Sequence, residues 1–466
     1  MNTLIAITGL GIFCLLFEIL NLRKAIVPFT IVGLLGVLAL NFYEFENATA
    51  THSYYNNMIT VSKFSTAFSS LFIILTIFLV ALSHNFYENH QTKISDFIAI
   101  KIFLLAGGVA MVSFGNLAMF FLGIEILSIA LYVLAASERL NLKSNEAGMK
   151  YFLMGSFASG IILFGICLIY GAMGSFDVVE ISESSLSAEL PIWFPIGMIL
   201  MTIGMLFKVA AVPFHFWAPD VYEGSPALTT ALMSTLAKVI AIATLFKLVA
   251  ELNLIPSLEN QGLLGTFENI IVIISIASMT VGNIMALRQV NVKRMLAFSG
   301  ISHAGFMLMT FLTVASSAGV LLYYTAAYAL AGIAAFSVIL YVCKNQENED
   351  ITNFHGLGKT NPLLAAILTA SLLSMAGIPI FSGFFAKLFL FDQTIKAGFI
   401  ALVIVAVINS IISVGYYFKL ILAMYSKEPN QERTGKPFLI YAVAVISIVL
   451  NIALGLFPSL VLDLLK

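Results

Sequence analysis

Four ionisable residues lie inside long apolar stretches of the sequence: Glu125, Lys208, Lys238 and Lys387. At the centre of a bilayer such a group costs about 2.5–3.5 kcal/mol on insertion scales. Ionisable groups kept at that cost commonly pair with one another or carry ions and protons. Because the four residues fall in four separate stretches, the pattern predicts a route for charge through a membrane.

Glu125 and Lys208 have the chemistry of a proton switch. Glu125 lies near the middle of stretch 115–136, and Lys208 lies one turn before Pro213 in another stretch. Burial favours the neutral amine, whereas a nearby carboxylate favours the ammonium. At 4 Å and an effective dielectric near 20 the attraction is about 4 kcal/mol. A change in their separation would therefore move a proton; a static ion pair joining two helices is the alternative.

Two further lysines and two histidines extend this set. Lys238 lies mid-stretch, and Lys387 follows an interruption in its own stretch. His303 lies inside a stretch, and His215 follows Pro213. Histidine titrates near neutral pH and can relay protons, although a buried histidine can also be a purely structural hydrogen-bond partner. Lys247 lies near the end of its stretch, and we interpret it as an anchor whose ammonium extends to the membrane surface.

The composition is that of a polytopic membrane protein. The chain has 466 residues, of which 60% are hydrophobic and 10% charged, with a net charge of −1. Nothing in this balance indicates nucleic-acid binding. The three cysteines are scattered and no Cys/His cluster occurs, so no metal site is expected. Neither a Walker A loop nor a dinucleotide fingerprint is present, and we expect no flavin, nucleotide or iron–sulfur cluster in this chain.

A membrane span needs about 20 mainly apolar residues. Stretches of this kind are α-helical, because a helix satisfies its own backbone in lipid. We therefore predict an all-α fold with about 14 transmembrane helices in one transmembrane domain, residues 1–466. The predicted spans are 3–20, 25–42, 64–84, 96–113, 115–136, 147–171, 192–216, 227–249, 268–287, 295–313, 318–342, 361–391, 397–424 and 438–460.

Successive connections between the predicted spans lie on alternate sides of the membrane, so the connections fall into two sets of opposite parity. Basic residues gather at the connections of one parity. The other parity holds only Lys63, Lys396 and Lys466. Since cytoplasmic loops carry an excess of lysine and arginine, both termini are predicted to lie outside the cytoplasm. The basic residues of the first parity are Arg23, Lys24, Lys93, Lys101, Arg139, Lys143, Lys150, Arg288, Lys293, Arg294, Lys344, Lys359, Lys427, Arg433 and Lys436.

Two predicted spans, the seventh and the twelfth, are discontinuous in sequence. Each places small residues before a proline, Pro213 or Pro379, and aromatic residues after it. Proline removes a helical hydrogen bond, and paired interruptions indicate an inverted-repeat core. The two spans are five apart, so spans 4–8 and 9–13 are predicted to form two inverted five-helix repeats, about 96–249 and 268–424. Two unrelated proline kinks are the alternative.

The same residues carry a resemblance to a known family. The chain resembles the antiporter-like membrane subunits of proton-pumping NADH:quinone oxidoreductase (complex I), most closely the subunit N branch. Lys387 favours that branch, because another branch has glutamate at this position. The end of the chain just after the last span favours it too, because the largest related subunit continues into a long lateral helix. The stretches that match are 121–125, 146–152, 207–226, 293–303 and 377–379.

The resemblance implies roles and partners. Glu125 and Lys208 match the paired glutamate and lysine, Lys238 the central lysine, Lys387 the exit lysine, and His303 lies on the central polar axis. It further implies proton translocation coupled to quinone reduction in other subunits, which hold the flavin and iron–sulfur clusters, and a place in the bacterial inner membrane. The alternatives are a subunit of an Mrp-type sodium/proton antiporter and a structural membrane anchor of a redox complex.

Overall fold

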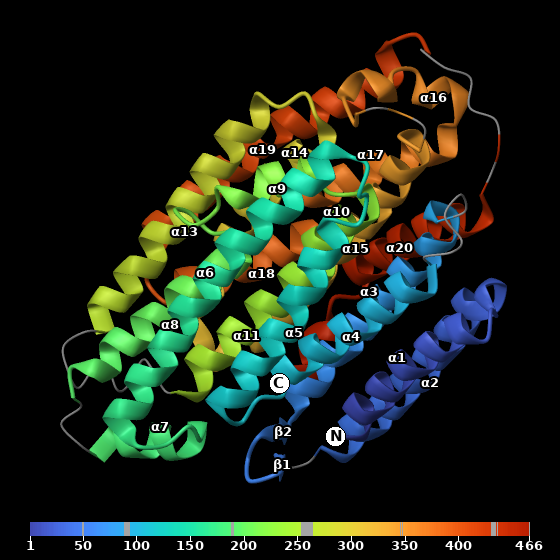
Figure 1. Ribbon diagram of the computed structural model, residues 1–466. Coiled ribbons are helices and arrows are strands. Elements are labelled where there is room, and N and C mark those ends of the chain that lie inside the picture. The colour runs from blue at the N-terminus through green and yellow to red at the C-terminus, as the bar shows by residue number, and fades with distance from the viewer. Residues whose placement is uncertain are drawn as a thin grey trace.

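The fold is a single bundle of long, roughly parallel helices (Figure 1). The structure is a computed structural model that describes residues 1–48, 51–87, 94–187, 191–252, 264–344, 346, 348–429, 435 and 437–465. The longer helices are α1 (Asn2–Ile19), α2 (Ile26–Asn47), α3 (Lys63–Phe86), α4 (Ile94–Val112), α5 (Leu117–Ala135), α6 (Leu142–Met173), α8 (Trp193–Val209), α11 (Lys238–Glu251), α13 (Leu264–Leu287), α14 (Val292–Leu308), α15 (Val314–Val342), α17 (Pro362–Ala376), α18 (Ser382–Lys396), α19 (Ile400–Ser426) and α20 (Phe438–Leu456).

The described part of the chain contains 11 helices long and apolar enough to cross a membrane, and two shorter apolar helices, α8 and α17. The prediction of a helical, multi-pass membrane protein is therefore confirmed, although the fold is nearly and not entirely helical. Helices occupy every one of the predicted stretches. Apolar residues surround most of these helices on all sides, as expected where one face packs on protein and the other faces lipid.

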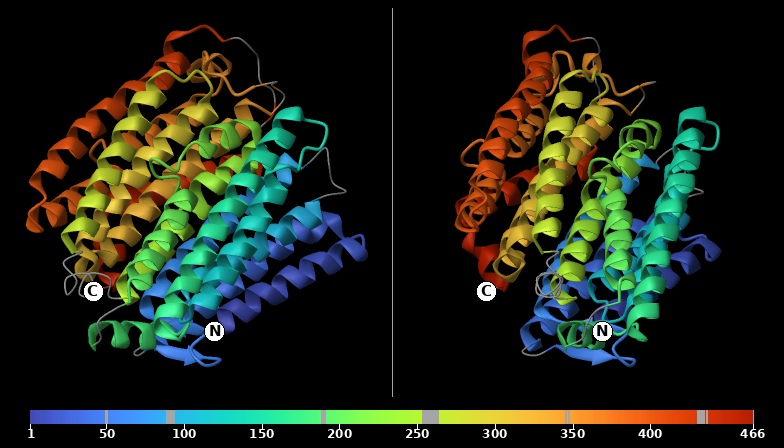
Figure 2. Two further views of the ribbon diagram at one scale, coloured as in Figure 1. Left: turned by 60° about the vertical axis from the view of Figure 1, so that its left-hand side comes forward. Right: turned by 90° about the vertical axis from the view of Figure 1, so that its left-hand side faces the viewer.

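Both termini lie at the same end of the bundle, together with a short hairpin and the helix α7 (Figure 2). The hairpin consists of β1 (His52–Tyr54) and β2 (Ile59–Val61), paired antiparallel. These strands and α7 (Val178–Ser187) fall in segments that the sequence analysis treated as loops. The short helix α16 (Leu357–Thr360) lies at the opposite end (Figure 1).

Helix α15 is the centre of the bundle. It packs against α3, α17, α18 and α20 and against the segment from α10 (Ala227–Leu232) to α11. By contrast, α1 and α2 form an edge pair that contacts the rest through α4 and α3. Lys238 on α11 and Lys387 on α18, described below, therefore lie on helices that pack against α15, and His303 contacts Tyr324 of α15.

The first predicted interruption lies between α8 and α9 (Trp217–Gly224). Helix α8 ends at Val209, and Ala210 takes a left-handed conformation with φ 61°. The indole N–H of Trp217 donates to the carbonyl of Phe207 at 3.0 Å, and the Val212 N–H donates to Ser278 Oγ at 2.9 Å. Partners of this kind are required for freed backbone groups at membrane depth.

The second predicted interruption separates α17 from α18. Gly377 ends α17 with φ 89°, and α18 begins at Ser382. A third irregularity was not predicted: a π-helical stretch, Met233–Ala237, separates α10 from α11 directly before Lys238. Such stretches often mark functional sites.

Candidate functional site

Lys208 lies in the last turn of α8. Its ammonium donates to Ser128 Oγ at 2.7 Å, to Ser159 Oγ at 3.2 Å and to the Tyr132 hydroxyl at 3.4 Å. These acceptors come from α5 and α6, so the lysine joins three helices through neutral groups.

Glu125 lies on α5, three residues before Ser128, the hydroxyl partner of Lys208. It is half-buried, and its Oε1 atom is enclosed without a hydrogen-bond partner among the described residues. No ion pair joins Glu125 to Lys208 in the part of the chain that the structure describes. The alternative of a static ion pair is thus wrong for this conformation, because Ser128 takes the place of the carboxylate.

Lys238 is the first residue of α11 and is only 3% exposed. Its ammonium donates to the backbone carbonyl of Gly300 in α14 at 2.7 Å. A Cβ atom on Gly300 would lie 3.0 Å from both Lys238 Nζ and the Tyr328 hydroxyl. The glycine therefore makes room for the lysine and exposes a carbonyl to it.

His303 lies at the centre of a cluster of hydroxyl groups. Its Nδ1 atom is 3.0 Å from the Tyr324 hydroxyl, and its Nε2 atom is 3.4 Å from the Tyr417 hydroxyl. The Tyr417 hydroxyl also bonds to Ser299 Oγ. Tyr328 lies against the imidazole, with ring centroids 4.8 Å apart. These tyrosines and Ser299 were not predicted, since hydroxyls inside apolar helices have no distinctive spacing in sequence.

Lys387 lies near the start of α18 and reaches back to the end of α17. Its ammonium donates to the carbonyls of Ala376 at 2.8 Å and Met375 at 3.2 Å, and to Ser410 Oγ at 2.8 Å. It also lies 5.0 Å from the Phe306 ring centroid. The interruption of the helix thus supplies the acceptors of the lysine.

A small cavity of about 10 Å³ lies between the His303 cluster and the interrupted helix. Tyr324, Tyr328, Ser374 and Met375 line it together with His303. This volume is about enough for one water molecule. A single water there would lie between His303 and the carbonyl-bearing turn that holds Lys387.

His215 and Lys247 lie apart from this set. His215 is 7% exposed, lies against Phe216 with the two rings tilted by 31°, and has an Nδ1 atom without a partner among the described residues. Lys247 does not extend to a membrane surface, which corrects the prediction of its position. It is 3% exposed and donates to Thr60 Oγ1 and to the carbonyls of Val112 and Phe114. We call Lys247 the internal tie, because its hydrogen bonds join the end of α4 to the hairpin.

Lys101 is a second correction. It was counted among the basic residues at connections, yet it lies within α4 and is 1% exposed. Its position inside predicted span 96–113 was the signal that could have identified it as buried.

An ion-pair network around Asp220, in the first turn of α9, joins three helices. Asp220 Oδ2 lies 3.0 Å from Lys150 Nζ, and Asp220 Oδ1 lies 2.7 Å from Arg294 Nη1. Partial burial raises the pKa of the Asp220 carboxyl, but the bonds from Arg294 and Lys150 outweigh it and hold the pKa below its usual range. The network fixes α9 between α6 and α14.

Comparisons with known proteins place this arrangement in a family. The family described as NADH:quinone oxidoreductase/Mrp antiporter, TM, matches residues 115–413. NADH-quinone oxidoreductase subunit N of Flavobacterium johnsoniae is 90% identical over 466 residues, 100% of both chains.

Two solved structures are similar as well. A chain of respiratory complex I from Thermus thermophilus superposes with a TM-score of 0.84 at 28% identity, over 99% of this chain and 98% of that one. A chain of the Mrp complex from Dietzia has a TM-score of 0.86 at 22% identity, over 99% of this chain and 95% of that one, which shows a shared fold. The family match and the 90% identity place the chain in the family of NADH-quinone oxidoreductase subunit N, as its sequence predicted.

Proposed function

We propose that the chain moves protons across the membrane along a polar axis from Glu125 and Lys208, through Lys238 and His303, to Lys387. The observation that carries this proposal is how the three lysines are held. Each ammonium donates to hydroxyls or backbone carbonyls, and none of the three has an ion-pair partner among the described residues. Such a lysine can gain or lose a proton without breaking an ion pair.

Each lysine lies at an irregularity of a helix. Lys208 lies in the last turn of α8, Lys238 follows the π-helical stretch, and Lys387 faces the end of α17. A helix C-terminus carries a partial negative charge, and non-helical backbone at membrane depth persists where it is buried in protein or lines water. The interruption after α17 therefore provides carbonyl acceptors for Lys387, and all three irregularities are candidate places for water.

His303 connects the central and last lysines in this proposal. The imidazole can donate at one nitrogen and accept at the other, and its two nitrogens contact Tyr324 and Tyr417. The one-water cavity beside it leads to Met375, whose carbonyl also binds Lys387. His215 is assigned a relay role toward one side, for which its unpartnered Nδ1 is the support.

The finer topology belongs to the same proposal: 14 spans, with inverted repeats over 96–249 and 268–424. One apolar segment, Val292–Val342, has 51 residues. A continuous helix of that length would measure about 75 Å, far more than the hydrocarbon core of about 30 Å. The 3₁₀ turn Met309–Thr313 within it supports a reversal between two spans. The shared end of the two termini supports an even number of spans.

The setting of the chain is also proposed. We place it in the bacterial inner membrane with both termini on the non-cytoplasmic side. Its partners are the other membrane and peripheral subunits of complex I, which use quinone and hold the flavin and iron–sulfur clusters. The scattered cysteines and the lack of binding motifs support the expectation that this chain itself holds no cofactor and no metal. The near-zero net charge supports the expectation that it has no nucleic-acid partner.

The test uses the complete complex, purified and reconstituted in lipid vesicles, with NADH oxidation and proton uptake measured together. We expect Lys208→Ala, Glu125→Ala and Lys387→Met each to lower the protons moved per NADH oxidised while the complex assembles. Lys396→Met is the matched control, because Lys396 lies exposed at the far end of the helix that carries Lys387. Wild-type reductase and proton-uptake rates in the Lys208 and Glu125 variants would refute the proposal and favour a structural anchor.

The Mrp-type alternative predicts different companions. Purification of the chain should bring down peripheral flavin and iron–sulfur subunits if it works in complex I. Co-purification with small hydrophobic subunits alone would support the antiporter instead.

A further inference from the structure

Lys101 is a buried lysine outside the axis described above. Its ammonium donates to Ser83 Oγ at 2.7 Å and lies 5.1 Å from the centroid of the Tyr87 ring. No carboxylate pairs with it among the described residues. A buried charge without a counter-charge costs several kcal/mol, so a lysine kept there needs an explanation.

Lys247 shows what a structural lysine looks like in this chain. It is as deeply buried as Lys101, but it has three oxygen acceptors and pairs with Glu251 at 3.3 Å. Lys101 has one hydroxyl acceptor and an aromatic face. Its position on α4 is therefore poorly suited to holding a permanent charge and better suited to a transient one.

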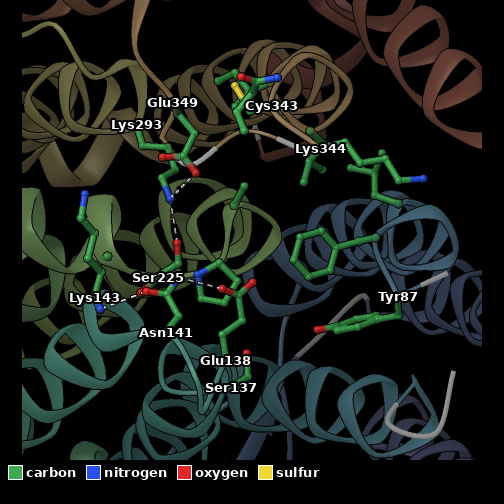
Figure 3. Close-up of a pocket in the computed structure, with 18 of the residues that line it drawn as sticks. Tyr87, Ser137, Glu138, Asn141, Lys143, Ser225, Lys293, Cys343, Lys344 and Glu349 are labelled. Carbon is green, nitrogen blue, oxygen red and sulfur yellow. Dashed lines mark hydrogen bonds and ion pairs between the residues drawn. The ribbon is translucent and has the colours of Figure 1, made fainter. Parts of the chain in front are cut away.

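A large cavity of about 690 Å³ is lined by Tyr87, the residue whose ring covers this lysine (Figure 3). Its lining includes apolar side chains such as Phe97 and Leu340 and the charged residues Glu138, Lys143 and Lys293. A cavity of this size with charged walls is roomy enough for many waters.

Tyr87 separates Lys101 from the large cavity. Its ring stacks on Phe97 with centroids 5.1 Å apart, and both rings line the cavity. In Figure 3 the Tyr87 hydroxyl points toward the side where Ser137 and Glu138 lie. The tyrosine thus has its face toward the ammonium and its hydroxyl toward the water-accessible space.

We propose that Lys101 is a proton-accepting residue, loaded from water in the large cavity. The neutral amine takes a proton from a hydronium ion to give the ammonium and water, and it later returns the proton to water or to the next acceptor. Helix α4 packs against α11, whose first residue is Lys238. The large cavity would then be an entrance to the polar axis, so this inference rests on the proposed function.

No charged group near α4 provides a counter-charge for Lys101. Among the described residues, no charged group on α4 or on the helices packed against α4 forms an ion pair or hydrogen bond with Lys101. These groups are Asp96 on α4, Glu18 on α1, Lys63 and His84 on α3, Glu125 on α5, and Lys238, Lys247 and Glu251 on α11.

The test compares Lys101→Met with Lys101→His in the complete complex, again in vesicles and over a range of pH. Methionine keeps length without a titratable group, so we expect fewer protons moved per NADH oxidised at every pH. Histidine has an ordinary pKa of about 6.5, so its proton movement should recover toward acid pH. Lys63→Met, at an exposed residue of neighbouring α3, is the control.

Several results would overturn the proposal. Wild-type proton movement in Lys101→Met is one, and equal behaviour of the two variants at every pH is another. Failure of both variants to assemble would assign Lys101 a structural role. If Lys238→Met stops proton movement while Lys101→Met does not, this inference fails alone; if neither stops it, the proposed function fails too.

Discussion

The ammonium of Lys387 donates to the carbonyl of Ala376 at 2.8 Å, so a lysine on one half of an interrupted helix occupies the C-terminal end of the other half. The last carbonyls of a helix have no partner within the helix and together carry about half a negative charge. Backbone dipoles here take the place of a carboxylate. Lys238 likewise donates to a backbone carbonyl, that of Gly300, but this carbonyl lies in the middle of α14 and not at a helix end.

Gly377→Ala tests the link between the interruption and Lys387. The left-handed conformation at φ 89° costs a non-glycine residue about 1–2 kcal/mol. The new Cβ would also lie 3.0 Å from Lys387 Cδ and 3.2 Å from its Nζ. We expect lower thermal stability together with fewer protons moved per NADH oxidised.

Gly398→Ala is the matched control for this change. Its φ of 90° gives the same strain, but nothing lies within 4 Å of the added Cβ. If both alanine variants lowered proton movement equally, the effect would be one of strain and the link to Lys387 would be refuted.

Gly300→Ala tests the cradle of Lys238. An added methyl group would lie 3.0 Å from Lys238 Nζ and 3.0 Å from the Tyr328 hydroxyl, closer than ordinary van der Waals contact. The lysine must move away from the Gly300 carbonyl, at a cost of about 1–3 kcal/mol for overpacking. We expect slower proton uptake in vesicles with the complex still assembled.

Gly160→Ala, on α6 with nothing within 4 Å of its added Cβ, provides the comparison for Gly300→Ala. A Gly300 variant that pumps as well as the Gly160 variant would show that contact between Lys238 and this carbonyl is dispensable.

The sequence predicted which segments are helices and where two of them break, because apolar length and proline position are local properties. Both breaks are present, at Ala210 and at Gly377. The π-helical stretch before Lys238 was not predictable, since Met233–Ala237 contains neither proline nor glycine. The hairpin and α7 were missed because their segments look like ordinary polar loops.

The candidate site was predictable as a set of residues but not as a set of contacts. A buried charge is conspicuous in an apolar segment, so Lys208, Lys238 and Lys387 were found. Their acceptors were not, because a serine such as Ser128 or a backbone carbonyl has no signature in sequence. The burial of Lys101 and Lys247 was also not predicted, since burial depends on neighbouring helices and not on distance from the end of a segment.

Lys247→Met tests the structural role of the internal tie. Removing the ammonium leaves the carbonyls of Val112 and Phe114 and the carboxylate of Glu251 without it. Breaking a buried pair by removing one partner costs about 3–5 kcal/mol. We expect a lower denaturation temperature or poor assembly, measured on the purified complex.

Lys396→Met should cost far less, because the exposed pair with Asp392 at 2.6 Å is of a kind that contributes about 0–1 kcal/mol. Equal denaturation temperatures for the Lys247 variant and the wild type would show that Lys247 is not a structural tie.

Asp220→Asn tests the ion-pair network in the first turn of α9. The folded pKa of this carboxyl lies below its usual value, since Arg294 and Lys150 favour the ionised form more than partial burial opposes it. The stabilisation is therefore present above the unfolded pKa of about 3.9 and is lost as pH falls through the folded pKa. The pairs are partly exposed, so each contributes about 0.2–1 kcal/mol.

We expect Asp220→Asn to lower the denaturation temperature at neutral pH, and the difference from wild type to shrink below about pH 4. Asp392→Asn, at an exposed pair within one helix, serves as the comparison and should change the temperature less. A difference that stayed constant or grew as the pH fell would mean that the Asp220 carboxylate does not stabilise the fold through Arg294 and Lys150.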